Sequence, residues 1–258
     1  MSQESASDEA LPDSSKTPGV RSALVFAVVG GLAGLVTAPV VDRYDDHFPM
    51  VSLTVEETNL IRADPNDPVA WGIERQNRWN WIFRNSALCL GMFGAILGAG
   101  LGLAECIRIR KPLKGITVLA LSVLLGVVGG VLSAAVDASI GIRMQDNIGS
   151  DPLPYAVAMH IAAFCLIGMG IATGMGLTTR RWSAVFRAFA GGLVAGVMFA
   201  PIAASAFPVY ETDLWIPHGL LPKFLFFGLA GLLLCLAIGR TPTRTETTVA
   251  TEPLDSEG

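Results

Sequence analysis

The sequence has few charged residues and no excess of positive charge. Of its 258 residues only 16% are charged, whereas 52% are hydrophobic, and the mean hydropathy is +0.53. This composition argues against a soluble enzyme or a disordered chain, because both need much more polar and charged surface. The formal net charge of −4 argues against a nucleic-acid-binding protein, which normally carries a basic patch. The composition therefore indicates an integral membrane protein.

The sequence also lacks the motifs of common catalytic and cofactor sites. Its four cysteines, which lie in apolar stretches, form no C-x-x-C motif and do not alternate with histidine at zinc-site spacing. A phosphate-binding G-x-x-x-x-G-K-[ST] motif is missing, as are the H-E-x-x-H and G-x-S-x-G motifs of hydrolases. We therefore predict no enzymatic activity, no cofactor and no metal site.

Long apolar stretches dominate what is present. Six of them, each about 20 to 24 residues long, are long enough to cross the ~30 Å hydrocarbon core as helices. They cover residues 22–41, 86–107, 115–136, 154–177, 184–207 and 219–239. Backbone amides find no water in lipid, so a run this apolar must satisfy its hydrogen bonds internally as a helix. The predicted fold is all-α, a polytopic bundle of six transmembrane helices.

The two ends of the chain differ from this transmembrane domain, which we place at residues 21–239. Residues 1–20 are rich in serine and acidic residues, and residues 240–258 in threonine, glutamate and proline. Both are predicted to be disordered tails, because neither has enough apolar surface to fold. A cleaved signal peptide is the alternative for the first stretch. We favour an uncleaved helix, because the preceding tail is long and acidic.

Lysine and arginine in the connections predict the orientation. The links after spans two and four carry Arg108, Arg110, Lys111, Lys114, Arg180 and Arg181, whereas the short opposite links carry little positive charge. Positively charged links lie on the cytoplasmic side, so both termini are predicted to be cytoplasmic, in the cell membrane. The opposite, outer side has one long connection, residues 42–85. Within it, Trp79, Trp81 and Phe83 are predicted to lie at the membrane interface as an aromatic belt; a binding cap is the alternative.

A pattern of small residues repeats in spans one, three and five. Each contains two glycines four residues apart, followed four residues later by alanine: Gly30 and Gly34, Gly126 and Gly130, Gly192 and Gly196. Residues four apart lie on one helix face, so each face lets a neighbouring backbone come close. We interpret the chain as three antiparallel hairpins with glycine-rich packing faces. A tightly packed bundle is the favoured meaning of this repeat, and a transporter built from three repeats is the alternative.

Polar and helix-breaking residues within the spans are the candidate sites. His160 lies about two turns inside span four, where it could relay protons or bind an ion, although a neutral histidine bonded to a neighbouring helix is the favoured interpretation. Glu105 and Arg187 lie near the inner surface and are predicted to be interfacial anchors, with a pair between them as the alternative. Pro39 and Pro201 are predicted to end their helices; a kink is the alternative.

Four acidic residues, Asp42, Asp46, Asp137 and Glu211, follow the odd spans on the outer side. We expect them to be ordinary solvated loop residues; a cation-attracting vestibule is the alternative. Taken together, these features predict a non-enzymatic membrane scaffold or assembly component. Its predicted partners are the lipid bilayer and other membrane proteins or a second copy of this chain, bound through an exposed glycine face, with no nucleic acid. The alternative function is a transporter or channel for a small solute or ion.

Overall fold

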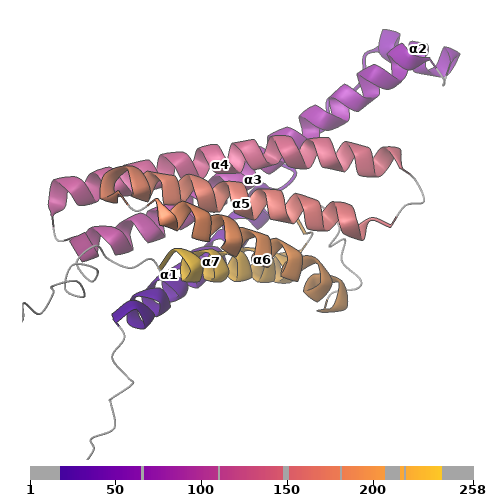
Figure 1. The fold of residues 1–258 in the computed structure, drawn as a ribbon. Coiled ribbons are helices and arrows are strands. Elements are labelled where there is room, and N and C mark those ends of the chain that lie inside the picture. The colour runs from indigo at the N-terminus through magenta and orange to yellow at the C-terminus, as the bar shows by residue number, and fades with distance from the viewer. Residues whose placement is uncertain are drawn as a thin grey trace, which may run out of the picture.

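The structure is a computed structural model that describes residues 18–64, 67–109, 111–147, 151–180, 182–206, 216–217 and 219–239. Its helices are α1 (Pro18–Tyr44), α2 (Val55–Ala63), α3 (Pro68–Ile109), α4 (Pro112–Asp146), α5 (Leu153–Thr179), α6 (Ser183–Ala206) and α7 (Leu220–Gly239) (Figure 1). All except α2 are long and apolar enough to cross a membrane. The predicted all-α fold with six spans is confirmed. Residues 1–17 and 240–258 of the predicted tails lie outside the described residues.

Two helices extend well beyond the stretches predicted for them. Helix α3 has 42 residues and begins at Pro68, 18 residues before the predicted second span, and α4 has 35 residues. The predicted outer connection is therefore largely helical, since α2 and the first part of α3 both lie in it. Hydropathy marks where a helix can enter lipid. It misses the start of α3 because this helical segment carries Glu74, Arg75, Arg78 and Arg84.

Helix α2 is a short polar helix that follows the loop after α1. Thr54 and Glu57 form a capping box at its N-terminus: the Glu57 N–H donates to the Thr54 hydroxyl, and the Thr54 N–H donates to the Glu57 carboxylate at 2.8 Å. Figure 1 shows α2 and the start of α3 projecting from one end of the bundle. We call this end the α2 end. The opposite end is the tail end, where the last residue of α7, Gly239, lies against the first turns of α1.

The six long helices form two layers around a common axis. Helices α3, α5 and α7 contact one another and form the centre. Helices α1, α4 and α6 lie outside them, each packed against two central helices: α1 against α7 and α3, α4 against α3 and α5, and α6 against α5 and α7. Most of the exposed large apolar side chains lie on these three outer helices. The outer helices therefore offer the apolar surface that lipid would cover.

Glycines bring pairs of helices into backbone contact. A methyl group on Gly30 would overlap the carbonyl oxygen of Gly231, and one on Gly94 would overlap that of Gly126. Three further glycines of the repeated pattern meet backbone atoms of a central helix in the same way: Gly34 at Phe227, Gly130 at Leu90 and Gly192 at Cys165. Gly196 meets the backbone of Ile161. These six pattern glycines all face another helix of the same chain, so the exposed glycine face expected for a second copy does not occur at these positions.

The helix pairs in closest contact agree with the expected ones only in part. The sequence interpretation joined span one with two, three with four, and five with six. The glycines bring α1 to α7, α4 to both α3 and α5, and α6 to α5, so only the contact of α4 with α5 is among the expected pairs. Each outer helix thus makes its closest contact with the central helix that precedes it along the chain, and α1 makes its own with the last helix. A small-residue face shows that some neighbour comes close, but it does not specify which one.

Candidate functional site

His160 lies in the centre of the bundle among aromatic rings. Its side chain is fully buried on α5. The imidazole packs edge-on against Phe199 of α6, with ring centroids 4.8 Å apart, and against Phe226 of α7 at 5.3 Å. Phe164, one turn further along α5, contacts Phe226 at 4.8 Å. His160 is therefore surrounded by apolar side chains from three helices.

The aromatic cluster continues across the centre to the third central helix. Phe227 of α7 touches both Phe226 and Phe93 of α3, each with ring centroids 4.9 Å apart. All of these phenylalanine side chains are fully buried. Ring centroids at these separations are in direct contact, so the described rings form one packed cluster. At the level of His160 the centre is filled by side chains.

Asp137 is a buried carboxyl group within α4. Its side chain has no exposed surface, and within the described part of the chain neither carboxylate oxygen forms a hydrogen bond. The expectation that it is a solvated loop residue is wrong, because α4 continues to Asp146, nine residues beyond it. A buried carboxyl group without a partner is costly, so its presence inside α4 needs a functional explanation.

Two other polar side chains lie at nearly the same depth as Asp137. The contact between Gly94 and Gly126 sets the register of α3 against α4. In this register the depth of Ser86 along the helix axis differs from that of Asp137 by about one helical turn or less. The contact between Gly129 and Leu166 sets the register of α4 against α5, and in this register His160 lies at nearly the same depth as Asp137. Ser86 is fully buried, and its hydroxyl makes no hydrogen bond with the described residues. Helices α3, α4 and α5 therefore each have one buried polar residue at a similar depth. We call these three residues, Ser86, Asp137 and His160, the Asp137 layer.

A second buried charge lies at the α2 end. The Lys223 side chain, near the start of α7, is 1% exposed, and its ammonium group donates to the Asp42 carboxylate at 2.7 Å and to Asp45. Both carboxylates keep part of their surface in solvent. This ion-pair cluster ties the end of α1 to the beginning of α7, the two helices that also share the Gly30 contact.

Asn85 holds the segment that follows α1 against α3. Its side-chain oxygen accepts from the Phe48 N–H at 3.0 Å, and its side-chain nitrogen donates to the Phe48 carbonyl at 3.0 Å. A side-chain amide that pairs with both the N–H and the carbonyl of one residue makes the same two hydrogen bonds as a neighbouring β-strand residue would. The extended segment 49–53 is thereby held beside α3, where it forms one wall of a pocket.

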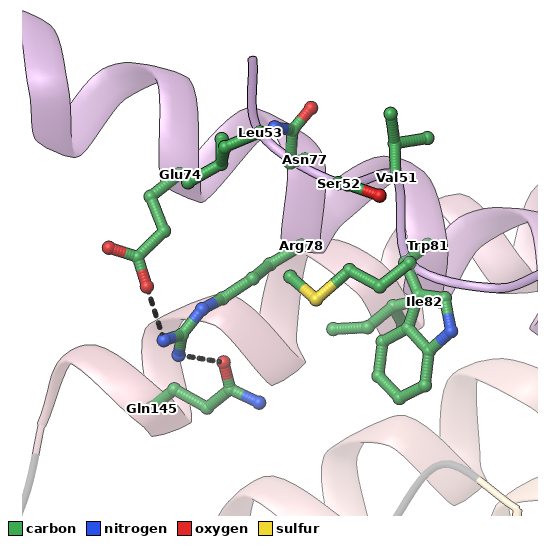
Figure 2. Close-up of a pocket in the computed structure, with 10 residues that line it drawn as sticks. Val51, Ser52, Leu53, Glu74, Asn77, Arg78, Trp81, Ile82 and Gln145 are labelled. Carbon is green, nitrogen blue, oxygen red and sulfur yellow. Dashed lines mark hydrogen bonds and ion pairs between the residues drawn. The ribbon is translucent and has the colours of Figure 1, made fainter. Parts of the chain in front are cut away.

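This α2-end pocket has a volume of about 530 Å³ and lies between segment 49–53, α3 and the end of α4 (Figure 2). Its lining residues are Met50, Val51, Ser52, Leu53, Glu74, Asn77, Arg78, Trp81, Ile82 and Gln145. Within the pocket the Arg78 guanidinium pairs with Glu74 at 2.5 Å and donates to the Gln145 side-chain oxygen at 3.2 Å. The pocket is therefore polar on one side and apolar on the other, as small-molecule sites generally are.

A smaller cavity of about 290 Å³ lies on the other side of Arg78. Arg75 and Asp146, which line it, form an ion pair at 2.6 Å. Nearby, the indole N–H of Trp79 donates to the Ser139 hydroxyl at 3.4 Å, and the Trp79 ring stacks on Phe83. These contacts fasten the first part of α3 to the last part of α4. Arg78 thus forms a partition between two cavities.

The other residues singled out from the sequence lie apart from these features. Helices α1 and α6 continue through Pro39 and Pro201, so the expectation that the prolines end their helices is wrong. Both prolines are exposed on outer helices, away from the central rings. Glu105 is fully buried and pairs with Arg108 at 2.5 Å. Arg187 lies half-buried on α6, which does not pack against α3 in the described structure, so a pair with Glu105 stays a prediction.

Sequence reasoning missed three buried polar residues. Lys223 and Asn85 were not selected as sites, and Asp137 was placed in a loop. The sequence did contain one usable signal for Asp137. Its neighbours Ala138, Gly141 and Ile142 continue the buried face of α4, so the helical pattern runs past the point at which the hydropathy window ends. Glu211, the fourth outer acid, lies outside the described residues.

The described residues contain no group of three or more histidine, cysteine, aspartate or glutamate side chains that could hold a metal ion. The four cysteines are not in disulfides, and three of them are buried. Comparison with protein-family models, with curated proteins and with solved structures finds no match to this chain.

Proposed function

We propose that this protein is a non-enzymatic membrane scaffold or assembly component. The observation that carries the proposal is the packed centre, in which His160 lies against rings of α5, α6 and α7 and the ring cluster continues to Phe93 of α3. A transporter of the alternating-access kind keeps its substrate site near the middle of the membrane, between repeats. Here that space is occupied by closely packed side chains. A rigid, glycine-packed bundle is well suited to holding other proteins in place.

The proposed orientation has the α2 end outside the cell membrane and both termini in the cytoplasm. The distribution of lysine and arginine supports it, because Lys111 and Lys114 lie at the tail end with other basic residues of the same connections. We further propose that the three pairs of outer and central helices are internal repeats. The layered packing of α1, α4 and α6 around α3, α5 and α7 supports this.

The scaffold would meet its partner at the α2 end. Helix α2 has no buried residue, and Val55 at its start is 77% exposed. At the adjoining start of α3, Val69 and Trp71 are also more than half exposed. Exposed apolar residues outside the spans commonly mark a protein or membrane contact. The proposed partner is another membrane protein or a second copy of this chain.

Site-specific photo-cross-linking in cells tests this surface. We expect a photoreactive residue at Val69 or Trp71 to capture the same protein from both positions. The matched control is Val28, which is 61% exposed on the lipid-facing side of α1 and should give lipid adducts. Mass spectrometry of the adducts distinguishes a second copy from another protein. Lipid adducts alone at all three positions would contradict the proposed contact surface.

Solute flux in proteoliposomes tests the filled centre. We expect no movement of protons, alkali cations or small anions above that of protein-free vesicles. A channel-forming peptide in parallel vesicles shows that each flux can be detected. If any of these solutes crosses at a rate that His160→Ala lowers, the scaffold proposal is wrong and the transporter takes its place.

Proton-linked transport is the second candidate function, because the Asp137 layer favours it. Unpaired carboxyl groups inside a bundle are expensive, and where they persist they commonly serve ion or proton movement. If Asp137 has no such role, replacing it should help the fold. We then expect Asp137→Leu to raise the free energy of unfolding by about 1–3 kcal/mol, the usual cost of a buried unsatisfied polar group.

Unfolding in detergent, followed by circular dichroism, measures this change. Asp146→Asn is the control, since Asp146 is 42% exposed and pairs with Arg75; we expect an effect of at most about 1 kcal/mol. A stabilised Asp137→Leu variant that leaves proton flux at the protein-free level supports the scaffold. Wild-type proton flux that Asp137→Asn abolishes would instead establish the second candidate.

A further inference from the structure

The α2-end pocket begins at the level of the aromatic belt and runs outward. Trp81 and Ile82 lie at one end of it and Glu74 at the other (Figure 2), and the eight-residue separation of Ile82 and Glu74 on α3 spans about 12 Å. Trp79 and Phe83, which stack on each other, belong to the same turns of α3. Because aromatic belts mark the boundary of the hydrocarbon, the predicted belt puts the part of the pocket from Ile82 to Arg78, about 6 Å along α3, at the depth of lipid headgroups, a layer about 5–8 Å thick on each side.

The two sides of the pocket match the two parts of a phospholipid. Met50, Val51 and Ile82 provide apolar lining, and Trp81 adds a large ring. Arg78 and Gln145 meet at another part of the lining, where they offer guanidinium and amide groups, and Asn77 adds a second amide to the lining (Figure 2). An amphipathic ligand would place its glycerol and first chain carbons on the first side and its headgroup on the second.

The charges in the pocket are balanced. Arg78 contributes one positive and Glu74 one negative charge, at 2.5 Å from each other on successive turns of α3. A ligand with only a negative charge would be repelled by Glu74, and a ligand with only a positive charge would be repelled by Arg78. A zwitterion can satisfy both groups at once. Opening the existing pair costs little, because its side chains are 43% and 30% exposed and such pairs contribute at most about 1 kcal/mol.

We propose that the α2-end pocket binds the headgroup of a zwitterionic phospholipid with a primary ammonium group, of the ethanolamine type. Arg78 binds the phosphate, for which its planar fork of N–H donors is well shaped. Glu74 accepts hydrogen bonds from the ammonium group, and the side-chain oxygen of Asn77 is a second acceptor beside it. A choline headgroup has no N–H to donate, so this arrangement discriminates against it.

Native mass spectrometry of the detergent-solubilised full chain tests the proposal. The protein is incubated with ethanolamine, choline and glycerol phospholipids that have identical acyl chains, and the retained lipid is measured. We expect the ethanolamine lipid to bind about tenfold or more tightly than the other two. Arg78→Gln should weaken binding of all three lipids, because each carries the phosphate, whereas Glu74→Gln should remove the preference for ethanolamine over choline and shift binding toward the anionic glycerol lipid. Arg62→Gln, an exposed change on α2 outside the pocket, should leave binding as in the wild type.

Several results would overturn the proposal. Equal binding of ethanolamine and choline lipids to the wild type would remove the role of Glu74. Undiminished binding of all three lipids to Arg78→Gln would exclude phosphate binding by Arg78. If soluble phosphoethanolamine competes as well as the whole lipid does, the ligand is a small zwitterion rather than a membrane lipid. Misfolding of Glu74→Gln would lower binding of all three lipids, whereas the proposal expects stronger binding of the glycerol lipid, so this variant keeps the outcome decisive even if Arg78→Gln is unstable.

Discussion

Replacing Gly94 by alanine is expected to destabilise the protein by about 2–3 kcal/mol, the usual cost of overpacking a closely packed interface. Gly94 on α3 lies against the backbone carbonyl of Gly126 on α4, and an added methyl group would overlap it. A backbone carbonyl cannot rotate away as a side chain can, so the two helices have to move apart. Their separation would also disturb the neighbouring contact between Gly130 and Leu90. Unfolding in detergent, followed by circular dichroism, measures the effect.

Gly91→Ala is the matched control for this experiment. Gly91 lies three residues earlier on the same helix, but a methyl group there would make an ordinary contact, 3.9 Å from a methyl group of Val127. Since alanine is the better helix former, this change should be neutral or stabilising by up to about 1 kcal/mol. Equal destabilisation by both changes would mean that helix propensity or lipid contact, rather than the backbone contact with Gly126, determines the stability here.

Removing both partners of Lys223 is expected to cost about 3–5 kcal/mol, the cost of leaving a buried charge without compensation. In Asp42→Asn with Asp45→Asn, the ammonium group stays in a site where the Lys223 side chain is 1% exposed. The converse change, Lys223→Met, should cost less, about 1 kcal/mol. The side chains of Asp42 and Asp45, which lose their partner in this variant, are 39% and 28% exposed, so water can hydrate their carboxylates in place.

The triple variant, which combines these three changes, separates the buried charge from the packing. We expect it to recover most of the stability that the double variant loses, because no uncompensated charge remains. Thermal unfolding of the four proteins in the same detergent gives the comparison. The interpretation fails if Lys223→Met costs as much as the double variant, since the buried ammonium would then not be the expensive group.

Much of the candidate site lay beyond sequence reasoning, and the reasons differ from residue to residue. The position of His160 inside a span follows from counting along an apolar stretch. The phenylalanine rings around it come from α5, α6 and α7, and no pattern along the chain relates Phe199 to Phe226. Asp137 was misplaced because a hydropathy window ends where charged residues begin, although the helix and its buried face continue. The α2-end pocket depends on Asn85 holding a loop 37 residues earlier in the chain.

The sequence by itself determined that the chain is an all-helical protein with six apolar spans. That follows from composition and length alone, since a backbone in lipid has to satisfy its own hydrogen bonds. Only the tertiary structure decided which helix faces which: α1 against α7, and α3, α5 and α7 at the centre. It also decided that Asp137 is enclosed while Asp42 reaches Lys223. All six spans are apolar enough for lipid, so hydropathy does not distinguish between possible neighbours. Which helices pack together depends on their shape and on a few polar contacts between distant residues, and the hydropathy of a single span contains neither.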